Sequence, residues 1–374
     1  MDEYEGLAGK SISNTPRIPV FHSSKKFRFR SLIAIGNPIV DIIAQITEET
    51  LKKFGMKFGE TVFSDDKKKG LYAELEKDPK VKFLPGGSIQ NTLRITSWII
   101  NMDSKEKHLY KISMLGAVGN DNYRDKIINA FNLAGVKYIL ETIPNMQTSR
   151  CGVGIYKKER SLLTEIRASN KLSEQFYKEN QDQIMEHDAL LIEGYFIQEN
   201  FDIIKDLCNK FKYKRKIVIL TLSALFIVQN YYDKILELAN YSDIIVGNMD
   251  EFLGFVGEKE QKTEILFENI SKKLVKKPRL FVVTNGSKGV ILAKYDYTRE
   301  TMDFIMKGFP SPIKQEEIVD TNGAGDSFLG GFLSQYMQGK SFESCCKAGN
   351  DVAGVILKNI GCTFPKHIKM KFND

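Results

Sequence analysis

Short apolar runs alternate with helix-length segments along most of this chain, and this alternation restricts the possible folds more than any other feature. We predict strands at residues 32–36, 111–115, 189–193, 217–220, 243–246 and 280–284. Helical spacing of apolar residues lies between them, at 91–101, 123–134, 201–211, 232–239 and 263–275. This order predicts an α/β fold with a doubly wound, mostly parallel sheet flanked by helices. Most of these strands are continuous apolar runs, which is typical of a sheet covered on both faces.

Two stretches depart from this rhythm and predict a second, smaller sheet. Alternating apolar and polar residues at about 40–64 and 150–168 indicate strands with one buried face. We interpret them as a small β-sheet lid on one large domain that covers residues 31–374. Residues 1–30 are polar and rich in Ser, Lys and Arg, and we expect a flexible N-terminal lead there.

Polar residues follow several of the predicted strands. Four short segments stand directly after an apolar run: Gly36-Asn37, Gly194-Tyr195-Phe196, Gly247-Asn248 and Asn285-Gly286. Loops at the carboxyl ends of parallel strands meet at one edge of the sheet, where such folds bind their ligands. The sequence therefore predicts one crevice lined by these loops.

The segment Asp320-Thr-Asn-Gly-Ala-Gly-Asp326 combines a glycine-rich turn with the start of a helix. Glycines leave backbone N–H groups accessible to an anion, and the positive end of the helix favours the same position. Asp326 is then placed to take a proton from an attacking hydroxyl. The alternative is a plain turn with a carboxylate at a helix start. Gly330 and Gly331 inside the following helix predict close approach of another backbone.

Two further segments have both a functional and a structural interpretation. Pro85-Gly-Gly-Ser-Ile-Gln-Asn91 opens a helix, either to bind a ligand through its N–H groups or with Ser88 as the N-cap. Asp41 interrupts an apolar run, and its carboxylate either accepts hydrogen bonds from vicinal hydroxyls or pairs with a cation.

Asn248-Met-Asp-Glu251 either caps a helix or helps to hold the Mg²⁺ of a nucleotide. Thr284-Asn-Gly-Ser-Lys-Gly289 is either a hairpin turn or a segment that lies along a nucleotide. Arg160 either bridges phosphates or is a solvated surface residue.

Composition argues against several classes of protein. Lys and Arg exceed Asp and Glu by 54 to 47, but the basic runs are short and lack interleaved aromatics, so RNA binding ranks last. The longest apolar run is too short for a membrane span. The number of cysteines, five, is odd, which argues against a disulfide framework and indicates a reducing, cytoplasmic compartment. The four histidines are widely scattered, which argues against a zinc site.

Taken together, these segments resemble the ribokinase-like (phosphofructokinase B) family of sugar and nucleoside kinases, over about residues 30–366. Gly86-Gly87 and Asp320–Asp326 match the family's early and late motifs. The resemblance is closest to the members that phosphorylate adenosine. It rests there on Gly36-Asn-Pro-Ile-Val-Asp41, Gly86-Gly-Ser-Ile-Gln-Asn91, Leu222-Ser-Ala-Leu-Phe226, Asn322 and Gly361-Cys-Thr-Phe-Pro365.

The resemblance implies transfer of the γ-phosphate of ATP to the 5′-hydroxyl of adenosine by a monomeric enzyme that uses Mg²⁺. There are two alternatives. The acceptor is another nucleoside or a sugar, or the chain is a non-catalytic nucleotide-binding regulator. The resemblance also implies a role for each site residue. Asp326 is the general base, and the backbone of Gly323, Ala324 and Gly325 forms the anion hole. The ribose is bound by Asn37, Asp41, Gly87, Ser88 and Asn91, and the purine by Phe63, Leu162, Phe196 and Phe226. ATP is bound by Asn248, Thr284, Gly286, Asn322, Asn350 and Arg160, and the metal by Glu251.

Overall fold

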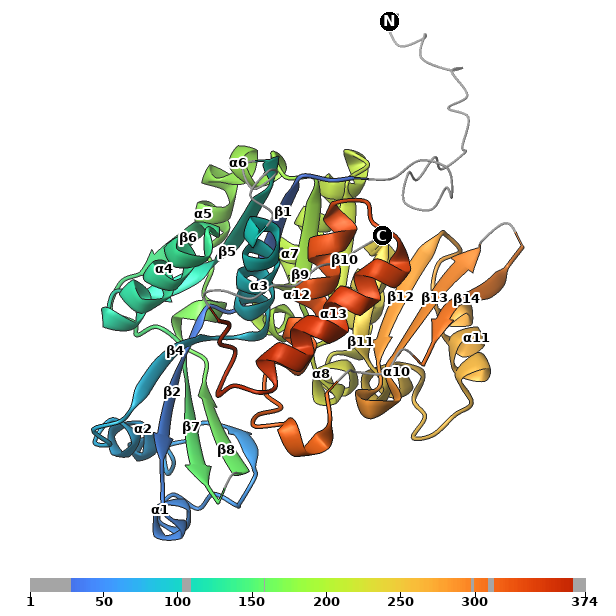
Figure 1. The fold of residues 1–374 in the computed structure, drawn as a ribbon. Coiled ribbons are helices and arrows are strands. Elements are labelled where there is room, and N and C mark those ends of the chain that lie inside the picture. The colour runs from blue at the N-terminus through green and yellow to red at the C-terminus, as the bar shows by residue number, and fades with distance from the viewer. Residues whose placement is uncertain (1–27, 103–108, 158, 297–298, 309–312, 366–374) are drawn as a thin grey trace, which may run out of the picture.

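The computed structural model describes residues 28–102, 109–157, 159–296, 299–308 and 313–365. These residues form a large sheet covered by helices and a smaller sheet that extends from one end of it (Figure 1). The α/β architecture predicted from the sequence is therefore confirmed. Among the described residues, no helix has both the length and the apolar character that crossing a membrane requires.

The large sheet has the strand order β14-β13-β12-β11-β10-β9-β1-β5-β6. Seven neighbouring strands of this sheet run parallel, namely β12, β11, β10, β9, β1, β5 and β6. Strands β13 and β14 extend the sheet beyond β12 in antiparallel pairing. All six predicted strands are present, and β6, β13 and β14 are additional. The bounds are β1 (Ser31–Ile35), β5 (Lys111–Gly119), β6 (Lys137–Ile143), β9 (Ala189–Glu193), β10 (Ile217–Thr221), β11 (Ile244–Asn248), β12 (Arg279–Thr284), β13 (Val290–Asp296) and β14 (Thr301–Lys307).

Helices cover both faces of this sheet, and each face has its own core. Within β1, Ile33 and Ile35 belong to one core whereas Leu32 and Ala34 belong to the other, which explains why the strand is apolar throughout. One face carries α3 (Ser88–Met102), α4 (Asn122–Ala134), α12 (Ala324–Met337) and α13 (Phe342–Ile356). The other carries α5 (Glu174–Glu179), α6 (Gln181–Met185), α7 (Ile197–Tyr213), α8 (Leu225–Asn230), α9 (Tyr232–Tyr241), α10 (Met249–Val256) and α11 (Thr263–Lys273).

Helix α12 lies between α3 and α13 near the middle of its face (Figure 1). Two glycines allow this close packing. A Cβ on Gly330 would lie 2.6 Å from a methyl carbon of Ile95 in α3, and one on Gly331 would lie 2.6 Å from the carbonyl oxygen of Ala348 in α13. The predicted close approach of another backbone is thus confirmed, and it fixes the start of α12 against the start of α3.

The smaller sheet has the order β3-β8-β7-β2-β4, and we call it the lid sheet. Its strands are β2 (Ile39–Gln45), β3 (Thr61–Phe63), β4 (Lys82–Gly86), β7 (Arg150–Tyr156) and β8 (Glu159–Glu165). Four of them fall in the two predicted stretches, whereas β4 was missed. The short helices α1 (Glu48–Lys53) and α2 (Gly70–Leu75) lie beside the lid sheet, with α1 at its far end (Figure 1).

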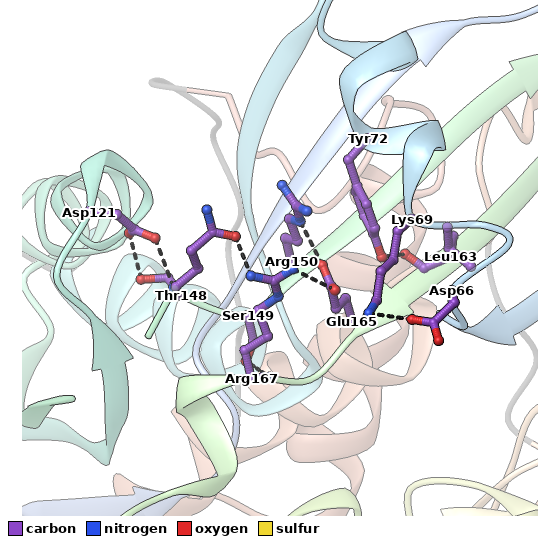
Figure 2. Close-up of polar contacts among 11 residues, drawn as sticks. Asp66, Lys69, Tyr72, Asp121, Thr148, Ser149, Arg150, Leu163, Glu165 and Arg167 are labelled. Atoms are coloured by element: carbon purple, nitrogen blue, oxygen red, sulfur yellow. Dashed lines mark hydrogen bonds and ion pairs between the residues drawn. The ribbon is translucent and has the colours of Figure 1, made fainter. Parts of the chain in front are cut away.

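A polar network joins the lid sheet to the large domain (Figure 2). The Glu165 carboxylate pairs with Arg150 at 2.9 Å and with Arg167 at 2.7 Å. The Thr148 hydroxyl donates to Asp121, the N-cap residue of α4, at 2.7 Å. These contacts hold both ends of the β7–β8 hairpin where it leaves the large domain.

The chain enters the fold slightly earlier than we predicted. Phe29 is buried against the ring of Tyr336, at 6.0 Å between centroids, and its N–H donates to the carbonyl of Met337. The predicted flexible lead otherwise falls on residues 1–27, outside the described residues. All five cysteines are buried and free, as expected.

Candidate active site

The glycine-rich segment forms a left-handed turn that leads directly into α12. Gly323 is the N-cap residue and has φ of 76°, a conformation that glycine adopts without strain. The first N–H groups of α12 have no acceptor within the helix. At Gly325, no atom lies within 4 Å of the place that a Cβ would occupy. The Ala324 N–H donates to the carbonyl of Thr321 at 3.3 Å. The turn therefore leaves the N–H groups after Ala324 for an anion at the positive end of the helix.

Asp326 lies in the first turn of α12 and faces the first turn of α3. The Ser88 hydroxyl donates to its Oδ1 at 2.6 Å, and the Asn91 amide donates to its Oδ2 at 3.2 Å. Burial raises the pKa of Asp326, and these two hydrogen bonds oppose the rise. Ser88 is itself the first residue of α3, so the alternative that it serves as the N-cap is wrong.

Asp41 lies on β2 of the lid sheet and faces the same region. Burial and the nearby charges of Asp326 and Asp320 raise its pKa to about 7, although Arg160 and Arg94 act in the opposite direction. Its carboxylate lies directly against Gly86, where a Cβ would be only 1.9 Å from Oδ1. The first glycine of the early motif is therefore required by the position of the Asp41 side chain.

Arg160 forms a buried ion pair with Asp320, at 2.9 Å between Nη1 and Oδ2. The same Asp320 carboxylate accepts the N–H of Gly361 at 2.6 Å and that of Asn322 at 3.0 Å. Of our two alternatives for Arg160, the solvated surface residue is wrong because the side chain is largely buried, and the bridging of phosphates stays a prediction. Arg160 stabilises the carboxylate that shapes the glycine-rich turn, because a buried Asp320 requires a partner.

Aromatic side chains from the lid sheet and the large domain meet each other. Phe63 of β3 contacts Phe226 edge to face at 5.9 Å, and Tyr195 lies 6.0 Å from Phe226. Phe196, which we placed at the purine, is fully buried in the core instead. Tyr195, the other aromatic residue of this loop, is half-buried and packs near Phe226. Leu162 is half-buried on the inner face of the lid sheet.

Two of the predicted nucleotide residues end neighbouring strands: Asn248 is the last residue of β11 and Thr284 is the last residue of β12. The two residues pair in register. Asn248 and Glu251 form a capping box, so the structural interpretation of this segment is confirmed. Gly286 lies in the turn of the β12–β13 hairpin, as the Asn-Gly signal predicted. Asn322 lies in the glycine-rich turn, and Asn350 is buried on α13.

Burial raises the pKa of Glu251 to about 7. Its carboxylate accepts bonds from the Asn248 backbone at 3.1 Å and side chain at 2.7 Å, and each oxygen keeps a lone pair. Within the described part of the chain, no three His, Cys, Asp or Glu side chains are grouped so that they could hold a metal. This donor set fits a cation bound mainly by phosphate oxygens and water, which is how Mg²⁺ binds with nucleotides.

Residues 52–369 match the model of the pfkB family carbohydrate kinases. The chain belongs to this family. Adenosine kinase 2 of Arabidopsis thaliana is 30% identical over 352 residues, which cover 91% of this kinase and 97% of that protein. Adenosine kinase of Dictyostelium discoideum is 28% identical over 342 residues, covering 89% and 96%.

Solved structures agree with this pfkB kinase in fold. Adenosine kinase of Trypanosoma brucei brucei superposes with a TM-score of 0.78 at 27% identity, covering 89% of this chain and 100% of that one. Adenosine kinase of Schistosoma mansoni in complex with 2-fluoroadenosine gives 0.76 at 23% identity, covering 90% and 97%. These matches show that the ribokinase-like fold predicted from the sequence is correct.

Sequence reasoning missed two residues of the candidate site. Tyr195 was named only as part of a loop, although it is the aromatic residue that faces Phe226. Glu193 was named only as the end of a strand, yet its side chain is buried and holds Asn37. The available signal for Glu193 was a single carboxylate that ends an otherwise apolar run, because a buried charge requires hydrogen-bond partners.

Proposed function

We propose that this kinase transfers the γ-phosphate of ATP to the 5′-hydroxyl of adenosine, giving AMP and ADP. Its family supplies the class of reaction, and the relatives from Arabidopsis thaliana and Dictyostelium discoideum are adenosine kinases. The observation that carries the proposal is the Asp326 carboxylate, which lies beside accessible N–H groups and is oriented by Ser88 and Asn91.

In the proposed reaction, Asp326 accepts the proton of the 5′-hydroxyl while that oxygen attacks the γ-phosphorus. The bond from the γ-phosphorus to the bridging oxygen breaks on the opposite side, and ADP leaves with the electron pair. The N–H groups of Gly323 through Asp326 stabilise the negative charge of the transferring group. Burial raises the pKa of Asp326, which makes its carboxylate a stronger base for the proton of the 5′-hydroxyl.

We assign the ribose to the polar groups around Asp41 and Asn37, together with Gly87 and Asn91. The two carboxylate oxygens of Asp41 match two vicinal hydroxyls, and Asp41 lies near the proposed general base Asp326. The purine then lies among Phe63, Leu162, Phe226 and Tyr195, with Tyr195 replacing our earlier choice of Phe196. We propose that the lid sheet closes over the nucleoside and excludes water from the transfer.

ATP is assigned to the loops after β11 and β12 and to the segment around α12 and α13, through Asn248, Thr284, Gly286, Asn322 and Asn350. Mg²⁺ would be held by phosphate oxygens and by water on Glu251, and when bound it neutralises phosphate charge. Arg160 acts on this region through Asp320. We also propose that the enzyme is a monomer and that it is cytoplasmic. The free cysteines support a reducing compartment.

A coupled assay of ADP release tests this proposal with adenosine, inosine, ribose and fructose as acceptors, each with MgATP. We expect adenosine to give a kcat/KM at least about a hundredfold above the others, because only it offers both the ribose and an aminopurine to the aromatic cluster. A preference for ribose or fructose would show that the chain is a sugar kinase of the same family. Consumption of ATP with none of the four would refute the proposal.

A further inference from the structure

The Glu193 side chain is 1% exposed and accepts three hydrogen bonds at the end of β9. Its Oε2 accepts the backbone N–H of Asn37 at 2.7 Å and the Asn37 side-chain amide at 3.0 Å. Its Oε1 accepts the backbone N–H of Ile89 at 3.2 Å. One carboxylate therefore connects three segments of chain that are distant in the sequence.

These three segments meet where the order of the large sheet reverses. Strand β1 lies between β9 and β5, and the chain leaves β1 for the lid sheet while β9 continues toward β10. Ligands of doubly wound sheets bind outside the carboxyl ends of the strands at such a point. Ile35 pairs with Ile192 in register, so the ends of β1 and β9 are adjacent and Glu193 spans the gap between their loops.

Gly36 provides the space for this carboxylate. A Cβ at residue 36 would lie 2.7 Å from Oε2 of Glu193 and 3.0 Å from its Cβ. Any side chain there would displace the carboxylate. The glycine that precedes Asn37 is thus explained by the position of Glu193.

The Asn37 side chain is fixed at both of its polar atoms. Its Nδ2 donates to Glu193, and its Oδ1 accepts the hydroxyl of Ser169 at 2.9 Å. Each atom keeps one further hydrogen-bonding position, a second N–H and a second lone pair. Glu193 and Ser169 together decide which side of the Asn37 amide presents the donor and which presents the acceptor.

The second anchor of Glu193 is the first turn of α3. The N–H of Ile89 lies between Ser88 and Asn91, whose side chains donate to Asp326. Displacement of this turn would therefore change the hydrogen bonds that orient Asp326. Among the described residues, Glu193 forms no hydrogen bond with Asp326 or with the glycine-rich turn, although the charges of the two carboxylates repel each other. Its effect on the orientation of Asp326 therefore passes through other residues.

We propose that Glu193 is a positioning residue that holds Asn37 and the first turn of α3 in one fixed arrangement, so that the acceptor and the base are aligned. This inference rests on the proposed function only in assigning Asn37 to the acceptor and Asp326 to the proton transfer. It adds a residue that binds no substrate and acts through both.

The test variant is Glu193→Gln, which keeps the shape of the side chain. An amide offers one acceptor oxygen, so either Asn37 or Ile89 faces an N–H group instead of an acceptor. We expect KM for the acceptor to rise about tenfold to a hundredfold and kcat to fall by a similar factor, as misplacement of reacting groups produces. KM for ATP should change by less than about twofold, because the loops after β11 and β12 are not touched.

Asp188→Asn is the matched control. Asp188 immediately precedes β9, and its Oδ2 likewise accepts three hydrogen bonds, from the N–H groups of Arg30 and Ser31 and from the Ser31 hydroxyl. It thus joins β9 to β1 at the opposite edge of the sheet. We expect this variant to lower the melting temperature while leaving both KM values unchanged. Equal changes of the kinetic constants in the two variants would show that Glu193 only stabilises the fold, and would overturn the inference.

A double-mutant cycle with Asn37→Ala separates positioning from general stabilisation. If Glu193 acts through Asn37, the effects of the two substitutions on acceptor KM are less than additive. Additive effects would contradict the inference. Should Glu193→Gln fail to fold, Glu193→Asp tests the same point, because its shorter side chain keeps the charge but cannot reach both Asn37 and Ile89. An acceptor KM equal to that of the wild type in this variant would also contradict the inference.

The comparison is made with whichever acceptor the wild-type enzyme turns over best. Failure of the proposed function appears in the wild type as a preference for an acceptor other than adenosine. Failure of the present inference appears only in the variants, as an acceptor KM equal to that of the wild type.

Discussion

The Ser88 hydroxyl donates a hydrogen bond of 2.6 Å to Oδ1 of Asp326, although the two residues begin different helices and are separated by 238 positions. The contact is possible because Gly330 lets α12 approach α3 closely. It links the early and late glycine-rich motifs in a single geometry. The orientation of the proposed base therefore depends on helix packing as well as on its own turn.

Replacing Asp326 with Asn should remove the proton acceptor while preserving the shape of the site. We expect kcat to fall by about a hundredfold to a thousandfold or more, equivalent to about 3–4 kcal/mol of transition-state stabilisation. Binding of adenosine, measured by calorimetry, should remain within a few-fold of the wild-type value. A variant with near-normal turnover would exclude Asp326 as the base.

Replacing Ser88 with Ala should shift the acidic limb of the pH–rate profile to higher pH. The Ser88 hydrogen bond stabilises the ionised form of Asp326 and so lowers its pKa. Without it the pKa rises, and the base becomes protonated, and therefore inactive, at a higher pH. The measurement is kcat/KM for adenosine against pH.

Thr92→Val is the matched control for this substitution. The Thr92 hydroxyl donates to the backbone oxygen of Asp326 at 3.3 Å and does not contact its carboxylate. We expect the acidic limb of this variant to coincide with that of the wild type. The same shift in both variants would attribute the effect to looser packing of α3 on α12.

Replacing Arg160 with Met should destabilise the protein by about 3 kcal/mol, because Asp320 would remain buried without its cationic partner. The measurement is the free energy of unfolding in urea. Removing both charges, as Arg160→Met with Asp320→Asn, should recover part of the loss. Lys272→Met breaks an exposed pair with Glu268 and should change little. An Arg160→Met variant as stable as the wild type would contradict this account.

Local signals predicted the main sheet and the late motif, whose effects lie within a few residues of sequence. The glycine-rich turn and the helix that follows it are both of this kind. Strand β4 was missed because Pro85 and Gly86 indicate a loop, yet this strand lies at the edge of the lid sheet, where such residues are tolerated.

The remaining errors concern partners that are distant in sequence. Tyr195 and Phe196 are adjacent aromatics in one short 3₁₀ turn, and only tertiary packing decides that Phe196 enters the core. The ion pair of Arg160 could not be predicted from its surroundings in the sequence, because its partner Asp320 belongs to another motif. Glu193 was missed for the same reason, since its partners follow β1 and begin α3.

The pH dependence of stability should reveal the buried carboxylate of Glu251. Burial raises its pKa from 4.5 to about 7, so between these values the folded protein binds a proton that the unfolded chain releases. The contribution of Glu251 to stability therefore falls as pH rises through this range, by at most about 3 kcal/mol. Glu251→Gln removes this titration but retains a residue that supports a capping box.

We therefore expect the free energy of unfolding of Glu251→Gln, relative to that of the wild type, to increase between about pH 5 and pH 7. Comparing the two proteins is essential, because Asp41 and Glu193, whose pKa values burial also raises to about 7, give the wild type a slope of the same sign in this range. Urea unfolding at several pH values provides the measurement. A constant difference across this range would mean that Glu251 is ionised throughout, and that a cation or water reaches it even in the free enzyme.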